Sequence, residues 1–210
     1  MSAGGAPGPG RGFRPALTVS REAGARATPI CEQLADYLSA EDESAEFGWT
    51  VFDKQLLTRV INANWLAGLE GEEEQATCGA FELTSRAIRR LALLGNTIII
   101  GLGAVYFTAD LDNVFHVRLV GSERDRIATA RRSLDLGTSE AADYLWHTDQ
   151  ERRDFALSYF REDIGNPLSY HAVINTDGIE DDVLARMIGD LFMGWAVAKA
   201  EAERKIVSFS

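Results

Sequence analysis

Within the first forty positions, the spacing of the apolar residues changes from a continuous run to the period of a helix. Residues 16–19 are apolar or β-branched, and a second set of apolar side chains then recurs every four residues, at Ile30, Leu34 and Leu38. That spacing marks one face of an α-helix. Pro29 suits the first turn of this helix and Thr28 suits its N-cap. The pattern predicts a strand, a loop of small residues and a helix.

Such a loop leaves backbone N–H groups free at the positive end of a helix, which is the physical basis of a phosphate site. The usual phosphate loop also has several glycines and a lysine. Here Gly24 is the glycine in place, Arg26 is the nearby cation, and no lysine follows. An ordinary strand–helix connection therefore remains an open alternative at this point.

The rest of the chain repeats the alternation of strand and helix. Further strands are predicted at 49–52, 97–100, 114–120 and 172–175, and further helices at 54–66, 81–94, 123–132, 140–147 and 179–203. Caps are predicted at Asp53, at Ser122 with Asp125, and at Thr148 with Glu151. The last helix carries one apolar side, formed by Val183, Met187, Leu191 and Trp195.

This order predicts an α/β fold in which a doubly wound parallel sheet is covered by helices on both faces. Ligands bind such sheets at the carboxyl ends of the strands. Three features should meet there: the loop after the first strand, the turn from Gly101 to Gly103, and the basic helix that follows Val120.

Composition restricts the class of function. A net charge of −11 argues against a general nucleic-acid or membrane-surface binder. The Gly/Pro-rich residues 1–15 predict a disordered tail without a signal peptide, and the most apolar stretch, 91–107, is interrupted by glycines. Cys31 and Cys78 lack metal-ligand spacing. We expect a soluble, single-domain protein with two inert thiols in a reducing cytoplasm.

Several motifs, taken in order, resemble one family. They are VSREAG, FDKQLL, IIIGLGA, HVRLVGSERDRIATARR, TDQERRDFALSYF and AVINTDGIEDDV. Together they are similar to the cytidylate-kinase-like branch of the P-loop nucleoside monophosphate kinases, from about residue 17 to residue 191. The resemblance implies five parallel strands with the first near the centre, one domain over 16–210 and a helical lid at about 131–161.

The resemblance also implies transfer of a phosphoryl group from ATP to CMP or dCMP with Mg²⁺. Carried over by position, it assigns catalytic and lid roles to Arg131, Arg132, Asp149 and Arg152. It assigns ATP binding to Ser20, Arg21, Gly24, Arg26, Thr28 and Arg153, and acceptor binding to Asp53, Lys54, Gly101 and Gly103. The four lid arginines should converge on a cleft above Gly24. The alternative for them is a solvated face paired with Glu123, Glu140 or Glu151.

Two positions depart from the family pattern. Ala27 stands where cytidylate kinases have lysine, and Leu102 stands where the acceptor turn usually has arginine. Both changes remove a cation from phosphate-binding positions, so slow turnover is expected. The second hypothesis is a catalytically inactive relative that senses nucleotides or binds a protein partner. The sequence leaves the acceptor and homo-oligomer formation open.

Overall fold

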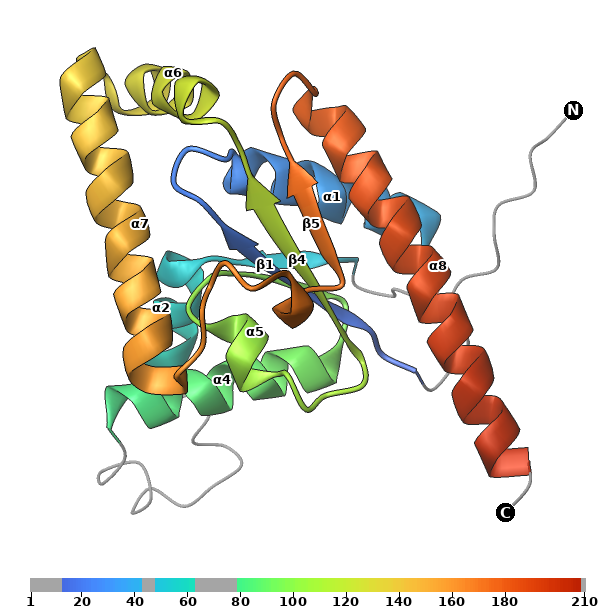
Figure 1. The fold of residues 1–210 in the computed structure, drawn as a ribbon. Helices are drawn as coiled ribbons and strands as arrows, with labels where there is room; N and C mark the ends of the chain where they lie inside the picture. Colours follow the sequence, from blue (N-terminus) through green and yellow to red (C-terminus); the bar gives the residue numbers. More distant parts are fainter. Residues whose placement is uncertain (1–12, 43–47, 63–78, 209–210) are drawn as a thin grey trace, which may run out of the picture.

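The computed structural model describes residues 13–42, 48–62 and 79–208. Within them, five parallel strands form one sheet in the order β2-β3-β1-β4-β5, with β1 at the centre (Figure 1). The strands are β1 (Ala16–Arg21), β2 (Thr50–Phe52), β3 (Thr97–Ile100), β4 (Val114–Val120) and β5 (Ala172–Asn175). This confirms the predicted doubly wound fold and the central position of the first strand.

Helices cover both faces of the sheet (Figure 1). The described helices are α1 (Ala27–Glu41), α2 (Lys54–Asn62), α4 (Ala80–Leu94), α5 (Ala104–Phe107), α6 (Glu123–Leu134), α7 (Thr138–Phe160) and α8 (Asp181–Ser208). Helices α1 and α8 bury apolar side chains against one face, and α2, α4 and α5 bury theirs against the other. Helices α6 and α7 pack on each other around Ala130 and Leu145, next to Ala23 of the loop after β1.

The two faces of β1 differ in chemistry. Leu17 and Val19 point into the core with α1 and α8. Thr18 and Ser20 alternate with them and point to the opposite face, as the two-residue period of a strand requires. That face is buried but polar at the centre of the sheet, and it is the face on which the candidate site lies.

Two predicted caps are wrong and two are confirmed. Helix α1 begins at Ala27 with Arg26 as its N-cap, so Thr28 already lies inside the first turn. Thr148 and Glu151 lie within the continuous helix α7, which extends the helix predicted over 140–147 in both directions. The caps at Ser122, whose hydroxyl accepts from the Asp125 N–H at 3.3 Å, and at Asp53 are present.

The predicted apolar side of α8 is shifted by one position. Leu184, Ile188 and Phe192 are buried against the sheet, whereas the predicted residues Val183, Met187 and Leu191 are exposed. The fourth predicted residue, Trp195, is partly buried and packs against the core. Both rows of this helix are apolar at four-residue spacing, so periodicity alone does not decide between them.

At the amino end, Phe13 belongs to the fold although it falls in the predicted tail, because its ring packs on Trp195 at 6.1 Å between centroids. The thiol of Cys31 is buried, and burial raises its pKa to about 12, as expected of an unreactive thiol. Cys78 and the predicted acidic loop at 70–75 lie outside the described residues, as do positions 63–66 of the second predicted helix. None of the helices in the described ranges combines the length and apolar run needed to cross a bilayer.

His116 lies on the polar face of the sheet. Its Nδ1 is 2.7 Å from the hydroxyl oxygen of Thr18, and its backbone N–H donates to Nδ1 of His171. Burial and the neighbouring His171 lower the pKa of His116 to about 4. A neutral buried imidazole in a strand is a structural element of this sheet.

The low pKa of His116 predicts a pH-dependent loss of stability. The unfolded chain binds a proton at this side chain near pH 6.5, but the folded chain binds it only near pH 4, so stability falls as pH falls through this window. Between pH 7 and pH 5, His116 should contribute a loss of about 2 kcal/mol. Urea unfolding of wild type and His116→Gln at both pH values measures it, with exposed His147→Gln as the control. Equal losses in wild type and His116→Gln would contradict the assignment.

Candidate active site

A cavity of about 420 Å³ opens at the carboxyl ends of β1 and β3, between α5 and α7. It is lined by Thr18 and Ser20 of β1, by apolar and aromatic side chains, by three cations and by one carboxylate, that of Glu151. The cations are Arg21, Lys54 and Arg152, and the apolar and aromatic residues include Leu102, Val105, Tyr106, Phe155, Ala156 and Ile164. A mostly apolar cavity with few convergent charged groups is typical of a small-molecule site.

Arg21 ends β1 and turns its side chain over the Gly101 turn. A Cβ placed on Gly101 would lie 1.7 Å from Arg21 Nη1, so only glycine leaves room for this guanidinium. Burial and the charge of Arg152 lower the pKa of Arg21 to about 10. The turn from Gly101 to Gly103 therefore has a cation beside it although Leu102 itself carries no charge.

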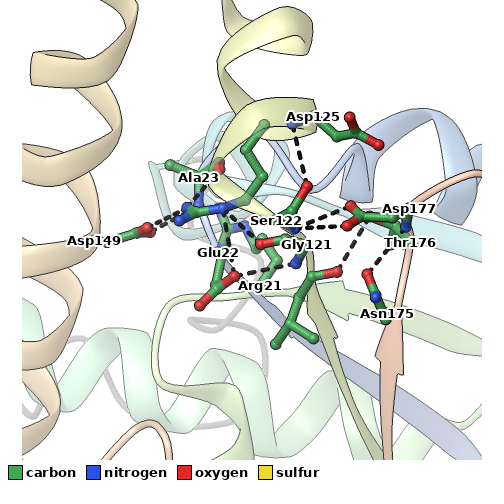
Figure 2. A network of polar contacts seen from close by, with 12 residues as sticks. Arg21, Glu22, Ala23, Gly121, Ser122, Asp125, Asp149, Asn175, Thr176 and Asp177 are labelled. Carbon is green, nitrogen blue, oxygen red and sulfur yellow. Dashed lines mark hydrogen bonds and ion pairs between the residues drawn. The ribbon is translucent and has the colours of Figure 1, made fainter.

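Asp149 of α7 contacts the loop after β1 (Figure 2). Its Oδ1 accepts from the backbone N–H of Ala23 at 2.7 Å, and its Oδ2 accepts from Arg126 Nη1 at 2.5 Å. Arg152, one turn further along α7, lies 3.5 Å from the same carboxylate and donates to the Arg21 carbonyl. A carboxylate of the chain itself thus occupies one N–H of the predicted phosphate loop.

Gly24 is required by the packing of this loop. Its φ is +80°, and a Cβ placed on it would lie 2.7 Å from the carbonyl oxygen of Arg126. The loop and the first turn of α6 are therefore in direct backbone contact, which only glycine permits.

Arg26 points away from the 420 Å³ cavity. It adopts a left-handed conformation with φ 54°, and its guanidinium donates to the carbonyls of Thr176 and Ile179 and pairs with Asp181 at 3.2 Å. The sequence predicts Arg26 as the cation of the loop, but its hydrogen bonds connect the loop to the residues at the start of α8 instead.

The remaining predicted residues fall into separate places. Asp53 accepts from the Leu56 N–H at 2.8 Å and caps α2, which brings Lys54 to the cavity wall. Gly101 and Gly103 line the cavity. Thr28 is exposed in the first turn of α1.

The four lid arginines do not converge on one cleft. Arg152 lines the 420 Å³ cavity, whereas Arg132 lines a second cavity of about 230 Å³ together with Gly24, Arg26 and Arg126. Arg131 is exposed and lines neither of the two. Arg153 is also exposed and reaches only a recess of about 10 Å³. The carboxylate next to Arg152 is Asp149 rather than Glu123, Glu140 or Glu151.

Two arginines of the site were not singled out in the sequence. Arg126 bridges Asp149, the Ala23 carbonyl and Glu22. Arg118 of β4 is buried and donates to Ser20 Oγ at 2.9 Å. The sequence does contain a sign of Arg118, because a charged residue within the otherwise apolar strand 114–120 is unusual and buried arginines are rare. Nothing in the local sequence separates Arg126 from its exposed basic neighbours.

Comparison with known proteins agrees with this architecture. Residues 16–178 match the model of the cytidylate kinase-like family. No curated protein matches the sequence significantly. Among solved structures, an uncharacterized protein from Eubacterium ventriosum ATCC 27560 superposes with a TM-score of 0.68 at 17% identity, covering 85% of this chain and 98% of that one. Shikimate kinase from Bacteroides thetaiotaomicron gives 0.51 at 15% identity, covering 84% and 97%. These two likenesses show a shared fold.

The Asp149 contacts predict a large stability effect. Asp149→Ala should lower the free energy of unfolding by about 3 kcal/mol, because it leaves the largely buried Arg126 side chain without its closest carboxylate. Urea denaturation measures the change. The matched control is Asp154→Ala on the same helix, whose exposed carboxylate accepts from Gln150 and should change stability by about 0.5 kcal/mol or less. Equal effects of the two variants would refute the role of Asp149.

Proposed function

The chain belongs to the cytidylate kinase-like family, and on that premise we propose that it transfers a phosphoryl group from ATP to CMP, dCMP or a related small acceptor. The loop between β1 and α1 is the place of transfer, and the reaction takes place in the cytoplasm. Phosphoryl transfer depends mainly on positioning and charge neutralisation, so it needs clustered cations more than a dedicated base.

The observation that carries the proposal is that two cavities flank this one loop. The 420 Å³ cavity reaches Ser20 and Arg21 at the end of β1, and the 230 Å³ cavity reaches Gly24 and Arg26. Two ligands bound in them would have their reacting ends near the same loop. We place the acceptor in the larger cavity and the donor in the smaller, beside Arg132.

Each group has a defined task in this arrangement. Arg21 and Arg152 hold and neutralise the phosphate of the acceptor, and Lys54 lies on the wall beside it. The apolar wall around Phe155 excludes water from the cavity.

Magnesium fits only as part of the nucleotide complex. In the described ranges, no three His, Cys, Asp or Glu side chains are grouped to hold a metal ion. The exposed Thr28 hydroxyl in the first turn of α1 would be one oxygen ligand for Mg²⁺ that arrives with the phosphates. The ion would neutralise charge on the transferring group.

A second function is favoured by one specific observation. One N–H of the loop, that of Ala23, is occupied by Asp149, and the Arg26 guanidinium is engaged before and at the start of α8. A donor must displace Asp149 before its phosphates reach that N–H. The same contacts would suit a catalytically inactive relative that binds nucleotides as a sensor or engages a protein partner.

The proposed function predicts slow but real CMP phosphorylation that depends on Arg152. Arg152→Gln should lower kcat/KM by about 10²–10³, because a cation on the transferring phosphates is lost at the transition state. Coupled assays with ATP, Mg²⁺ and CMP or dCMP measure the rate, and calorimetric titration of each nucleotide measures binding. Arg186→Gln, which removes an exposed arginine of α8, is the matched control.

Two results would change the conclusion. Nucleotide binding without any turnover would favour the inactive relative. Turnover of tens per second in wild type would show that the loop is not weakened by the loss of its lysine.

A further inference from the structure

A separate cavity of about 300 Å³ opens near the amino ends of β4 and β5, at the edge of the sheet opposite to the candidate active site. It is lined by the segment between α5 and β4, by His116 of β4, by residues 168–171 before β5, and by Trp195 and Lys199 of α8. Within the described chain it shares no lining residue with the 420 Å³ cavity. Its volume is at the lower end of the range for small-molecule pockets, so it has room for a small ligand.

The ring of His171 supplies a hydrogen-bond donor at this cavity. Its Nδ1 accepts from the backbone N–H of His116 at 2.9 Å, so the neutral ring carries its proton on Nε2. Burial and the charge of Lys199 lower the pKa of His171, which keeps the ring neutral above pH 7. In the part of the chain that the structure describes, no acceptor for this Nε2–H is found. The donor is therefore available to a ligand.

The charges that line the cavity are one ammonium group and one carboxylate. Lys199 Nζ lies 3.3 Å from Asp112 Oδ1, and the two side chains are 39% and 90% exposed. An ion pair this exposed contributes little to stability, so another carboxylate can replace Asp112 at small cost. Because the charge of Lys199 acts on the pKa of His171, the two donors lie near one another.

The rest of the cavity wall favours a ligand with an apolar body. The His171 ring stacks on Phe115 at 4.8 Å between centroids and lies 5.7 Å from the Trp195 ring. Leu111 and Val114 also line the cavity. A metal ion does not fit, since within the described ranges the two imidazoles and Asp112 are not grouped as a set of three metal ligands.

We propose that this cavity binds a small carboxylate with an apolar body, whose negative charge is held by Lys199 Nζ and the Nε2–H of His171. A carboxylate accepts through two oxygens, so it can bind both donors at once. A single lysine matches one negative charge and leaves the second charge of a phosphomonoester without a partner. The site is independent of phosphoryl transfer, and its test requires no turnover.

Imidazole NMR spectra recorded during a titration with benzoate test the site. The chain has three histidines, so each ring can be followed separately, and exposed His147 is the internal control. Above pH 7, benzoate should shift the His171 resonances to saturation and leave those of His147 unchanged. Benzamide has the same ring without the charge, so it should bind at least about tenfold more weakly.

A matched pair of lysine variants on α8 locates the charge. Lys199→Gln should weaken benzoate binding by about 10- to 100-fold, because a charge-assisted hydrogen bond is lost. Lys205→Gln, which changes an exposed lysine outside the cavity, should bind benzoate as wild type does.

Four results would overturn the proposal. One is equal affinity for benzoate and benzamide, and another is wild-type affinity in Lys199→Gln. The third is the absence of a saturable His171 shift with both benzoate and cyclohexanecarboxylate. The fourth is benzoate binding that is lost in Arg152→Gln and retained in Lys199→Gln, which would place the anion in the 420 Å³ cavity instead.

Discussion

The contact between the Asp149 carboxylate and the Ala23 N–H holds the candidate site together. It links the loop after β1 to helix α7, and the second oxygen of the same carboxylate binds Arg126 of α6 (Figure 2). Three segments far apart in the sequence therefore share one buried charge. Because α7 is attached to the loop through this carboxylate, any anion that takes over the Ala23 N–H must first displace Asp149.

The polar face of the sheet explains why the site lies where it does. A sheet covered on both faces is normally apolar throughout, yet the two central strands carry Thr18, Ser20, His116 and Arg118 on one face. Their hydrogen bonds to one another reduce the cost of burial. The remaining positive charge of Arg118 has no such compensation, and it lies where β1 and β4 approach their carboxyl ends.

Much of the fold could be predicted from the sequence, because strand and helix periods are local. The central strand and the start of the β1–α1 loop follow directly from residues 16–38. The register of α8 could not be predicted, since two of its rows are apolar and only packing selects Leu184, Ile188 and Phe192. The predicted cap at Thr28 is wrong for a related reason. The left-handed Arg26 takes the N-cap position, and its side chain is held by the carbonyls of Thr176 and Ile179, which are 150 and 153 residues away in the sequence.

The sequence predicted where the candidate site lies in the fold, but not which side chains contact one another there. The sequence placed Asp149, Arg152 and the glycine turn in one region, and the cavity brings the last two together. The packing of the helices and strands decides which arginine side chains are buried, and the local sequence does not contain this information. Arg131 and Arg153 are exposed, whereas Arg118 is buried. The sequence predicts Gly101 as part of a turn, and the structure adds that a glycine is needed there to leave room for the Arg21 guanidinium.

The most direct test of this account is a crystal structure with ADP, Mg²⁺ and CMP bound together. We expect the ADP phosphates over the β1–α1 loop, with Asp149 released from the Ala23 N–H. We expect the CMP phosphate between the guanidinium groups of Arg21 and Arg152 in the 420 Å³ cavity. Nucleotides bound elsewhere, with Asp149 still on Ala23 and the 420 Å³ cavity empty, would contradict the account.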